Sequence, residues 1–287
     1  MRDFEPINVK VDGAPTVLYI ATPDSDWFTG GGGDEFVVPQ SGRAYLSTTN
    51  YTDPETYFKP SLLGGSVEFD ADISQDACGC VAAFYTVSMP ARNSDGSYNP
   101  GEKGQYYCDA NMVGGTYCPE FDLMEANTKA FQATPHSCDA PDEHGFYSNC
   151  DRSGECYQNS VEKLDPMAFG PGSSYMINTM EIIHVRTDFN MDDASEFSSF
   201  TTTISQNGNS VQLHGECESN SKMSGDLKEG MVFALSNWYG GEPWLDKGIC
   251  GGINECSNPT LTFTNMEFNQ GPYGKSFAQN GTELLSY

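Results

Sequence analysis

Three acidic residues lie close together in the chain, where Glu120, Asp122 and Glu125 form an E-x-D-x-x-E pattern within an apolar stretch. A pair of carboxyl groups is what glycosidases use to hydrolyse the acetal bond of a sugar, one as acid and the other as nucleophile or base. The pattern therefore predicts a glycosidase. Acids make up 40 of the 287 residues, so a solvated acidic strand edge with this spacing is also expected about once by chance.

The spacing of the acids constrains the strand that carries them. Side chains of a β-strand alternate between its faces, so Glu120 and Asp122 share a face while Glu125 points away. A β-bulge near Leu123 and Met124 adds one residue and returns Glu125 to that face. The outer carboxyl groups would then lie roughly 6 Å apart, near the ~5.5 Å of a retaining glycosidase. We therefore predict a bulge and a retaining mechanism, in which Asp122 tunes the charge of the nucleophile through a shared proton or hydrogen bond.

The elements around these acids are predicted to be strands. Apolar and polar residues alternate with a period of two, turn residues separate the runs, and long helical periodicities are nearly absent. We expect strands over residues 16–20, 44–48, 65–73, 81–87, 175–188, 200–205, 231–238 and 261–268. This number of strands predicts an all-β fold of two packed antiparallel sheets, one of them curved to hold a ligand.

The composition restricts the compartment and the partners. Ten cysteines without C-x-x-C pairs predict a secreted, disulfide-bonded protein rather than a zinc protein. No segment approaches the length of a membrane span, and the first residues show no signal-peptide core, so the sequence is expected to be a mature form. The net charge of −26 disfavours nucleic acid and anionic membrane as partners, whereas a neutral glucan escapes this repulsion.

Residues 120–138, E-F-D-L-M-E-A-N-T-K-A-F-Q-A-T-P-H-S-C, resemble the E-M-D-I-W-E-A-N…T-P-H-P-C signature of glycoside hydrolase family 7, which comprises cellobiohydrolases and endoglucanases. Further matches at 62–89, 105–109, 169–175 and 230–246 extend the resemblance over residues 35–270 in the same order. It implies a concanavalin-like jelly roll whose curved sheet forms a glycan-binding cleft, as a single catalytic domain over residues 1–287. Residues 1–34 match only weakly and are expected to form an N-terminal extension, and residues 272–287 a flexible tail.

The resemblance also implies roles for individual residues. Glu120 matches the nucleophile, Glu125 the general acid/base and Asp122 the carboxylate that assists the nucleophile. His136, in the T-P-H match, is implied on the leaving-group side of the catalytic site. Trp238 and Trp244 match stacking platforms on either side of the cleavage point. The substrate-binding positions that the resemblance implies are Tyr85, Tyr107, Asp109, Asn111, Arg152, Trp238 and Trp244.

Several departures from the family pattern bear on the cleft. Met124 replaces a tryptophan, and Met112 replaces a cysteine, so one disulfide of the family is missing. The connections before Cys118 and between Trp238 and Trp244 are short, where the family inserts loops that roof a tunnel. The resemblance therefore implies an open cleft that favours internal cuts. The cysteine pairs it implies are Cys108–Cys118, Cys78–Cys250 and Cys138–Cys156, with the other four cysteines left open.

Taken together, the sequence predicts a secreted, monomeric, retaining endoglucanase that cleaves β-1,4-glucosidic bonds of cellulose or a related β-glucan without a metal or cofactor. Two other enzymes on the same fold remain alternatives, namely a β-1,3 or mixed-linkage glucanase and an exo-acting cellobiohydrolase. A non-catalytic, lectin-like glucan-binding protein is the third alternative.

Overall fold

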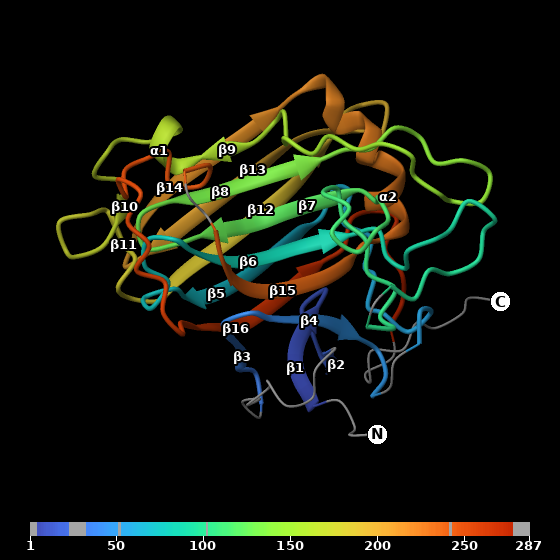
Figure 1. Ribbon diagram of the computed structural model, residues 1–287, viewed down its shortest axis with the longest axis horizontal. Helices are drawn as coiled ribbons and strands as arrows, with labels where there is room; N and C mark the ends of the chain where they lie inside the picture. The colour runs from blue at the N-terminus through green and yellow to red at the C-terminus, as the bar shows by residue number, and fades with distance from the viewer. Residues whose placement is uncertain (1–4, 23–32, 51–52, 102, 241–242, 278–287) are drawn as a thin grey trace.

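The computed structural model describes residues 5–22, 33–50, 53–101, 103–240 and 243–277, and within them the chain is nearly all β (Figure 1). The strands are, in chain order, β1 (Glu5–Val11), β2 (Ala14–Ala21), β3 (Phe36–Pro39), β4 (Gly42–Ser47), β5 (Ser66–Asp72), β6 (Cys80–Val87), β7 (Glu120–Ala126), β8 (Phe131–His136), β9 (Gln158–Asn159), β10 (Phe169–Gly170), β11 (Ile177–Asn178), β12 (Ile183–Met191), β13 (Phe197–Gln206), β14 (Asn209–Glu216), β15 (Val232–Tyr239) and β16 (Thr260–Asn269). The helical segments are short, namely α1 (Ser160–Lys163), the 3-10 helix η1 (Glu218–Met223) and α2 (Ser224–Glu229).

The predicted all-β sandwich is confirmed, although its two layers are parts of one hydrogen-bonded sheet. The strand order is β14-β13-β12-β5-β16-β1-β2-β4-β15-β6-β7-β8-β9, with β3 paired to β16. We call β4, β15, β6, β7, β8 and β9 the cleft layer, and β14, β13, β12, β5 and β16 the back layer. In Figure 1 the cleft layer lies in front of the back layer.

Aromatic side chains hold the two layers together. Phe121 of β7 contacts Phe189 of β12 and Phe200 of β13, with ring centroids 4.9 and 5.1 Å apart. Phe84 of β6 contacts Phe69 of β5 at 4.7 Å. All five rings are at most 1% exposed, and burial of a phenyl side chain stabilises a fold by about 1.5–3 kcal/mol. This core fixes which face of the cleft layer is turned outward.

The hairpin of β1 and β2 connects the two layers. Seven residue pairs join β1 to β2, β2 pairs with β4, and β1 pairs in parallel with β16. The side chains of Ile7, Val9 and Val11 are buried while their neighbours are exposed, which is the alternation of a half-buried strand. Residues 5–21, within the predicted N-terminal extension, are therefore built into the sheet.

The prediction of a single strand over residues 175–188 was wrong. The segment forms two strands, β11 and β12, separated by a turn at residues 179–182. The Asn178 side chain accepts the backbone N–H of Met180 and its carbonyl accepts that of Glu181. An asparagine that binds the backbone two residues on favours a turn over a continuous strand.

At the C-terminal end, Phe277 packs on Phe58 with ring centroids 5.0 Å apart. The rest of the predicted tail, residues 278–287, lies outside the described residues. No helix in the described part of the chain is long and apolar enough to cross a membrane.

Five disulfides are formed, and two of the implied pairs are confirmed. Cys108 pairs with Cys118 and Cys78 with Cys250. The implied Cys138–Cys156 pair was wrong, because Cys138 and Cys150 face each other across an antiparallel bridge and are bonded there. The remaining pairs are Cys156–Cys217 and Cys80–Cys256.

Candidate active site

The predicted bulge is present in β7 and places the three acids on one face. Opposite β8, Asp122 pairs with Thr134 and Glu125 with Gln132, so β7 has two residues between the pairs where β8 has one. The two side chains between these pairs, Leu123 and Met124, are fully buried in the core between the layers. Glu125 therefore returns to the outward face that Glu120 and Asp122 occupy.

This face is the floor of a cleft of 820 Å³. Nine of the predicted site residues line it, namely Glu120, Asp122, Glu125, His136, Tyr85, Tyr107, Asp109, Asn111 and Trp238. They come from β6, β7, β8 and β15 and from the segment before β7, where Tyr107 directly precedes the loop that Cys108–Cys118 closes. Residues from distant parts of the sequence thus converge on the three acids.

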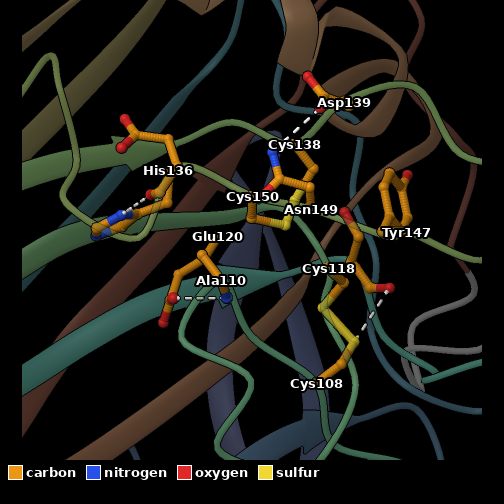
Figure 2. Close-up of a disulfide and its surroundings, with 12 residues drawn as sticks. Cys108, Ala110, Cys118, Glu120, His136, Cys138, Asp139, Tyr147, Asn149 and Cys150 are labelled. Carbon is orange, nitrogen blue, oxygen red and sulfur yellow. Dashed lines mark hydrogen bonds between the residues drawn. A yellow bond between two sulfur atoms is a disulfide. The ribbon is translucent and has the colours of Figure 1, made fainter.

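The two glutamates have different hydrogen-bond environments. Oε2 of Glu120 accepts the backbone N–H of Ala110 at 3.1 Å (Figure 2). No such donor reaches the Glu125 carboxyl among the described residues, and its side chain is partly exposed. Burial and the charge of Asp122 raise the pKa of both glutamates, and the Ala110 N–H opposes this shift at Glu120. Since an N–H donor favours the charged form, Glu120 is the better site for the negative charge and Glu125 for the proton.

Asp122 pairs with His136, since its Oδ2 lies 3.1 Å from Nε2 of the imidazole. Burial by itself lowers the pKa of His136, but the hydrogen bond and charge of Asp122, with the charge of Glu120, raise it to about 10. The imidazole is therefore a buried cation beside three acids. Its charge offsets part of their mutual repulsion, which allows some of them to stay ionised. The expected shared proton or hydrogen bond between Asp122 and the nucleophile Glu120 is therefore not found among the described residues, because the Asp122 carboxylate accepts the Nε2–H of His136 instead.

Arg43 of β4 lines the same cleft and was not identified from the sequence. Its guanidinium carbon lies 3.9 Å from the ring centroid of Tyr107, a cation–π contact. The hydroxyl of Tyr107 lies 3.2 Å from that of Tyr85. One signal could have revealed Arg43, since it shares a strand face with Tyr45 two residues on and is one of only 14 basic residues.

The loop that carries Asp109 and Asn111 is held by its own contacts. The Asp109 carboxylate accepts the N–H of Val113 at 2.9 Å, and the N–H of Cys118 is donated to the Asp109 carbonyl. With the Cys108–Cys118 disulfide, these bonds close a short loop over one side of the cleft. Polar groups there are fixed before a ligand arrives.

The two tryptophans do not stand on opposite sides of the acids. Their rings stack on each other, with centroids 6.1 Å apart and planes at 17°. Trp238 is 36% exposed and lines the cleft, whereas Trp244 packs behind it and donates its indole N–H to the Gly240 carbonyl. They form a single aromatic wall, in place of two separate platforms.

Arg152 is the other predicted residue that the structure does not bring to the cleft. It lies in an exposed turn directly after Asp151. The neighbouring Asp151 contacts the site through its backbone carbonyl, which lies 2.7 Å from Nδ1 of His136. Among the described residues, no group of three or more His, Cys, Asp or Glu side chains forms a metal-binding cluster.

A further buried acid lies behind the cleft wall. Asp76 is fully buried, and neither oxygen of its carboxyl has a hydrogen-bond partner among the described residues. Burial raises its pKa to about 7, which the nearby Asn237 amide partly offsets and the charge of Asp72 increases. Asn237 itself lines the cleft beside Trp238.

We expect Asp76 to make stability fall as the pH rises from 4 to 7. In the native state Asp76 keeps its proton in this range, whereas in the unfolded state it has lost it. The free energy of unfolding should therefore be about 4 kcal/mol lower at pH 8 than at pH 4 because of this residue. In Asp76→Asn this contribution should be lost, so stability should fall less steeply between pH 4 and 8, as measured by denaturant unfolding. The exposed Asp193→Asn is the control, and identical slopes in the two variants would contradict the expectation.

Comparison with known proteins adds an independent line of information. The sequence model of glycosyl hydrolase family 7 matches residues 109–226, which include the acids and His136. Endoglucanase EG-1 of Trichoderma longibrachiatum is 30% identical over 298 residues, covering 92% of this chain and 60% of that protein. The chain spans 60–67% of the length of the curated endoglucanases that it matches.

Solved structures share the fold. A structure of endoglucanase I in complex with cellobiose superposes with a TM-score of 0.78 at 18% identity, covering 94% of this chain and 97% of that one. A family 7 cellobiohydrolase from Daphnia pulex has a TM-score of 0.71 at 17% identity, covering 94% and 97%. Because both an endoglucanase and a cellobiohydrolase have this fold, the fold alone does not decide where along a glucan the chain is cut.

Proposed function

We infer that the chain belongs to glycosyl hydrolase family 7, and from this premise we propose that it is a retaining endoglucanase that cleaves β-1,4-glucosidic bonds in an open cleft. The observation that carries the proposal is the bulge in β7, which brings Glu120, Asp122 and Glu125 to one cleft face beside His136. A strand that only exposed charge to solvent would have no need of this break in register.

The hydrogen-bond environments support a division of work between the glutamates. Glu120, stabilised as an anion by the Ala110 N–H, attacks the anomeric carbon. Glu125 carries the proton, and gives it to the glycosidic oxygen as the bond between that oxygen and the anomeric carbon breaks. The result is a glycosyl ester on Glu120 and a free sugar hydroxyl.

In the second step Glu125, now ionised, removes a proton from a water molecule that attacks the anomeric carbon. The ester bond breaks and Glu120 is released as a carboxylate, so the two inversions give net retention. Asp122 and His136 form an ion pair that lines the cleft together with Glu120 and Glu125. Their contribution is electrostatic, since the charge of Asp122 raises the pKa of both glutamates and the imidazolium charge lowers it.

The walls of the cleft fit a neutral sugar chain. Trp238 offers a flat apolar surface for a sugar ring, with Trp244 stacked behind it. Tyr85, Tyr107 and Arg43 offer hydroxyl and guanidinium groups. A buried polar group that loses its partner costs about 1–3 kcal/mol, so such a lining discriminates between sugars by their hydroxyls.

Exposure of the cleft walls supports internal cleavage. Trp238 on one wall is 36% exposed and Val113 on another is 67% exposed. A tunnel roofed over these residues would bury both. A chain can enter such a cleft from the side, and does not have to be threaded from an end.

The five disulfides support secretion, because such bonds persist in oxidising compartments. The β-glucan is then met outside the cell, by a protein that we propose acts as a monomer with residues 1–287 as one catalytic domain. The strong negative charge keeps it apart from anionic surfaces.

Digestion of a panel of glucans tests the proposal. With soluble cellulose derivatives the viscosity should fall early, before much reducing sugar appears, and the products should include chains of many lengths. The β-anomer should appear first in an NMR time course of cello-oligosaccharide hydrolysis, because retention preserves the β configuration.

The alternatives predict other products. Release of cellobiose alone from chain ends would replace the endo assignment with an exo one. Preference for laminarin or barley glucan would point to a β-1,3 or mixed-linkage enzyme. First appearance of the α-anomer would exclude retention, and binding without release of reducing sugar would indicate a lectin.

A further inference from the structure

The turn at residues 151–155 lies directly against the imidazole of His136. Disulfides flank it on both sides, Cys138–Cys150 before it and Cys156–Cys217 after it. Figure 2 shows the first of these disulfides together with His136 and Glu120. The N–H of Asp151 is also donated to the Ser137 carbonyl, next to His136 in the sequence. The turn is therefore tied to the end of β8 that carries the histidine.

The Asp151 carboxylate organises this turn from within. It accepts the backbone N–H groups of Ser153, Gly154 and Glu155 at 3.1, 3.1 and 2.5 Å, and the Ser153 hydroxyl at 2.8 Å. These bonds fix the backbone of Asp151, and with it the direction of its carbonyl. Aspartate commonly forms such bonds to the residues that follow it in a turn.

The Asp151 carbonyl keeps one imidazole nitrogen of His136 protonated. It lies 2.7 Å from Nδ1 of His136, and a carbonyl oxygen can only accept a hydrogen bond. Nδ1 is therefore protonated, and Nε2 faces Asp122 at 3.1 Å. A histidine nitrogen held in this way by a backbone carbonyl fixes the ring orientation and keeps the proton on that nitrogen.

Gly154 allows the turn to approach so closely. Its φ is +66°, and a Cβ built there would lie 2.9 Å from Cε1 of His136 and would also overlap the Thr134 methyl group. Both the backbone conformation and the space exclude a side chain. The turn thus closes one side of the imidazole by direct contact.

We propose that the 151–155 turn is a positioning element for the reaction, in which Asp151 and Gly154 hold His136 so that Nδ1 keeps its proton and Nε2 is presented to Asp122. This inference rests on the proposed function of the acidic cluster. If this is so, Asp151 and Gly154 control the positive charge that acts on Glu120 and Glu125 without contacting either glutamate. If the imidazole is displaced, the pKa of Glu120 and of Glu125 rises, because the cation that lowers both is lost.

Gly154→Ala tests this in the full chain. The added methyl should displace the ring, and the acidic limb of the kcat/KM pH profile should move to higher pH by about one unit. In ¹⁵N-histidine NMR spectra, assigned with His136→Gln, Nδ1 of His136 should be protonated across neutral pH in the parent protein and should lose this fixed state in the variant.

Gly251→Ala is the matched control. Gly251 has a φ of +62° and nothing within 4 Å of a built Cβ, so it imposes the same backbone strain without the contact. Asp151→Ala removes the four internal bonds of the turn without a clash, and serves if Gly154→Ala does not fold. It should move the pH profile in the same direction.

Two results would overturn the proposal. One is a pH profile of Gly154→Ala and Asp151→Ala that equals that of Gly251→Ala, with only the Tm lowered. The other is a His136 Nδ1 without a proton in the parent protein. The NMR measurement needs no turnover, so it shows whether the turn holds the imidazole even if no glucan is hydrolysed. Absence of glucan hydrolysis would contradict the proposed function, and not this proposal.

Discussion

Replacement of Glu120 by glutamine is expected to lower glucan hydrolysis by about 10⁴-fold or more, since the amide cannot form the glycosyl ester. Shape and hydrogen-bonding capacity change little, so the affinity for a cello-oligosaccharide should change by less than about tenfold. The measurement is kcat/KM by reducing-sugar release, with the Kd from calorimetry. Loss of turnover with retained binding separates a chemical role from a structural one.

Glu143→Gln is the control for this experiment, because Glu143 has an 88% exposed side chain and lies outside the cleft lining. It should retain the parent activity. If Glu120→Gln hydrolyses glucan at the rate of Glu143→Gln, the assignment of the nucleophile is wrong. If it also fails to bind the oligosaccharide and unfolds at a lower temperature, Glu120 is primarily structural.

The second large effect is expected at Glu125. Glu125→Gln should slow the hydrolysis of glucan by about 10²–10⁴-fold, the range of general acid–base catalysis. In an aryl glycoside derived from a phenol of low pKa, the phenolate leaves without being protonated. Formation of the glycosyl ester from this substrate should therefore keep most of its rate in Glu125→Gln. The ester on Glu120 then accumulates, because no base activates water, and a burst of phenol should be followed by slow turnover.

Azide distinguishes the two glutamates. As an anion it needs no base, so it should restore turnover in Glu125→Gln and give a glycosyl azide of β configuration. The same addition to Glu120→Gln should not give the β-azide, since no ester forms there. An α-azide from Glu125→Gln, or equal losses on glucan and on the aryl glycoside, would contradict the assigned roles.

Much of the chemistry was predictable from the acids because strand geometry is periodic. The parity of Glu120, Asp122 and Glu125 requires an inserted residue, and the register of β7 against β8 contains it. Strands β5 and β6 were equally predictable, since β5 alternates between buried and half-buried residues and β6 is a run of mostly apolar, fully buried residues. In both cases the decisive interactions are local in sequence, which is the range over which periodicity carries information.

What could not be predicted depends on contacts between distant segments. The partner of Cys138 is fixed by the bridge to Cys150, and the role of Trp244 by its stacking on Trp238. Arg43 of β4 contacts Tyr107 of the segment before β7, although 64 positions separate the two residues in the sequence. In strand β14 buried and exposed residues alternate in the structure. Only Val211 and Leu213 are large apolar residues in it, so its sequence pattern is a weak indication of a strand.

The place of β16 in the sheet has a consequence for how the protein is made. This strand lies between β5 and β1, so the back layer cannot connect to the hairpin that joins it to the cleft layer until β16 arrives. A ribosome delivers β1 and β5 early and β16 after all the other strands. The two layers therefore cannot be joined through β16 until synthesis is nearly complete. The sheet closes after translation because its longest-range pairing, between β1 and β16, is formed by its last strand.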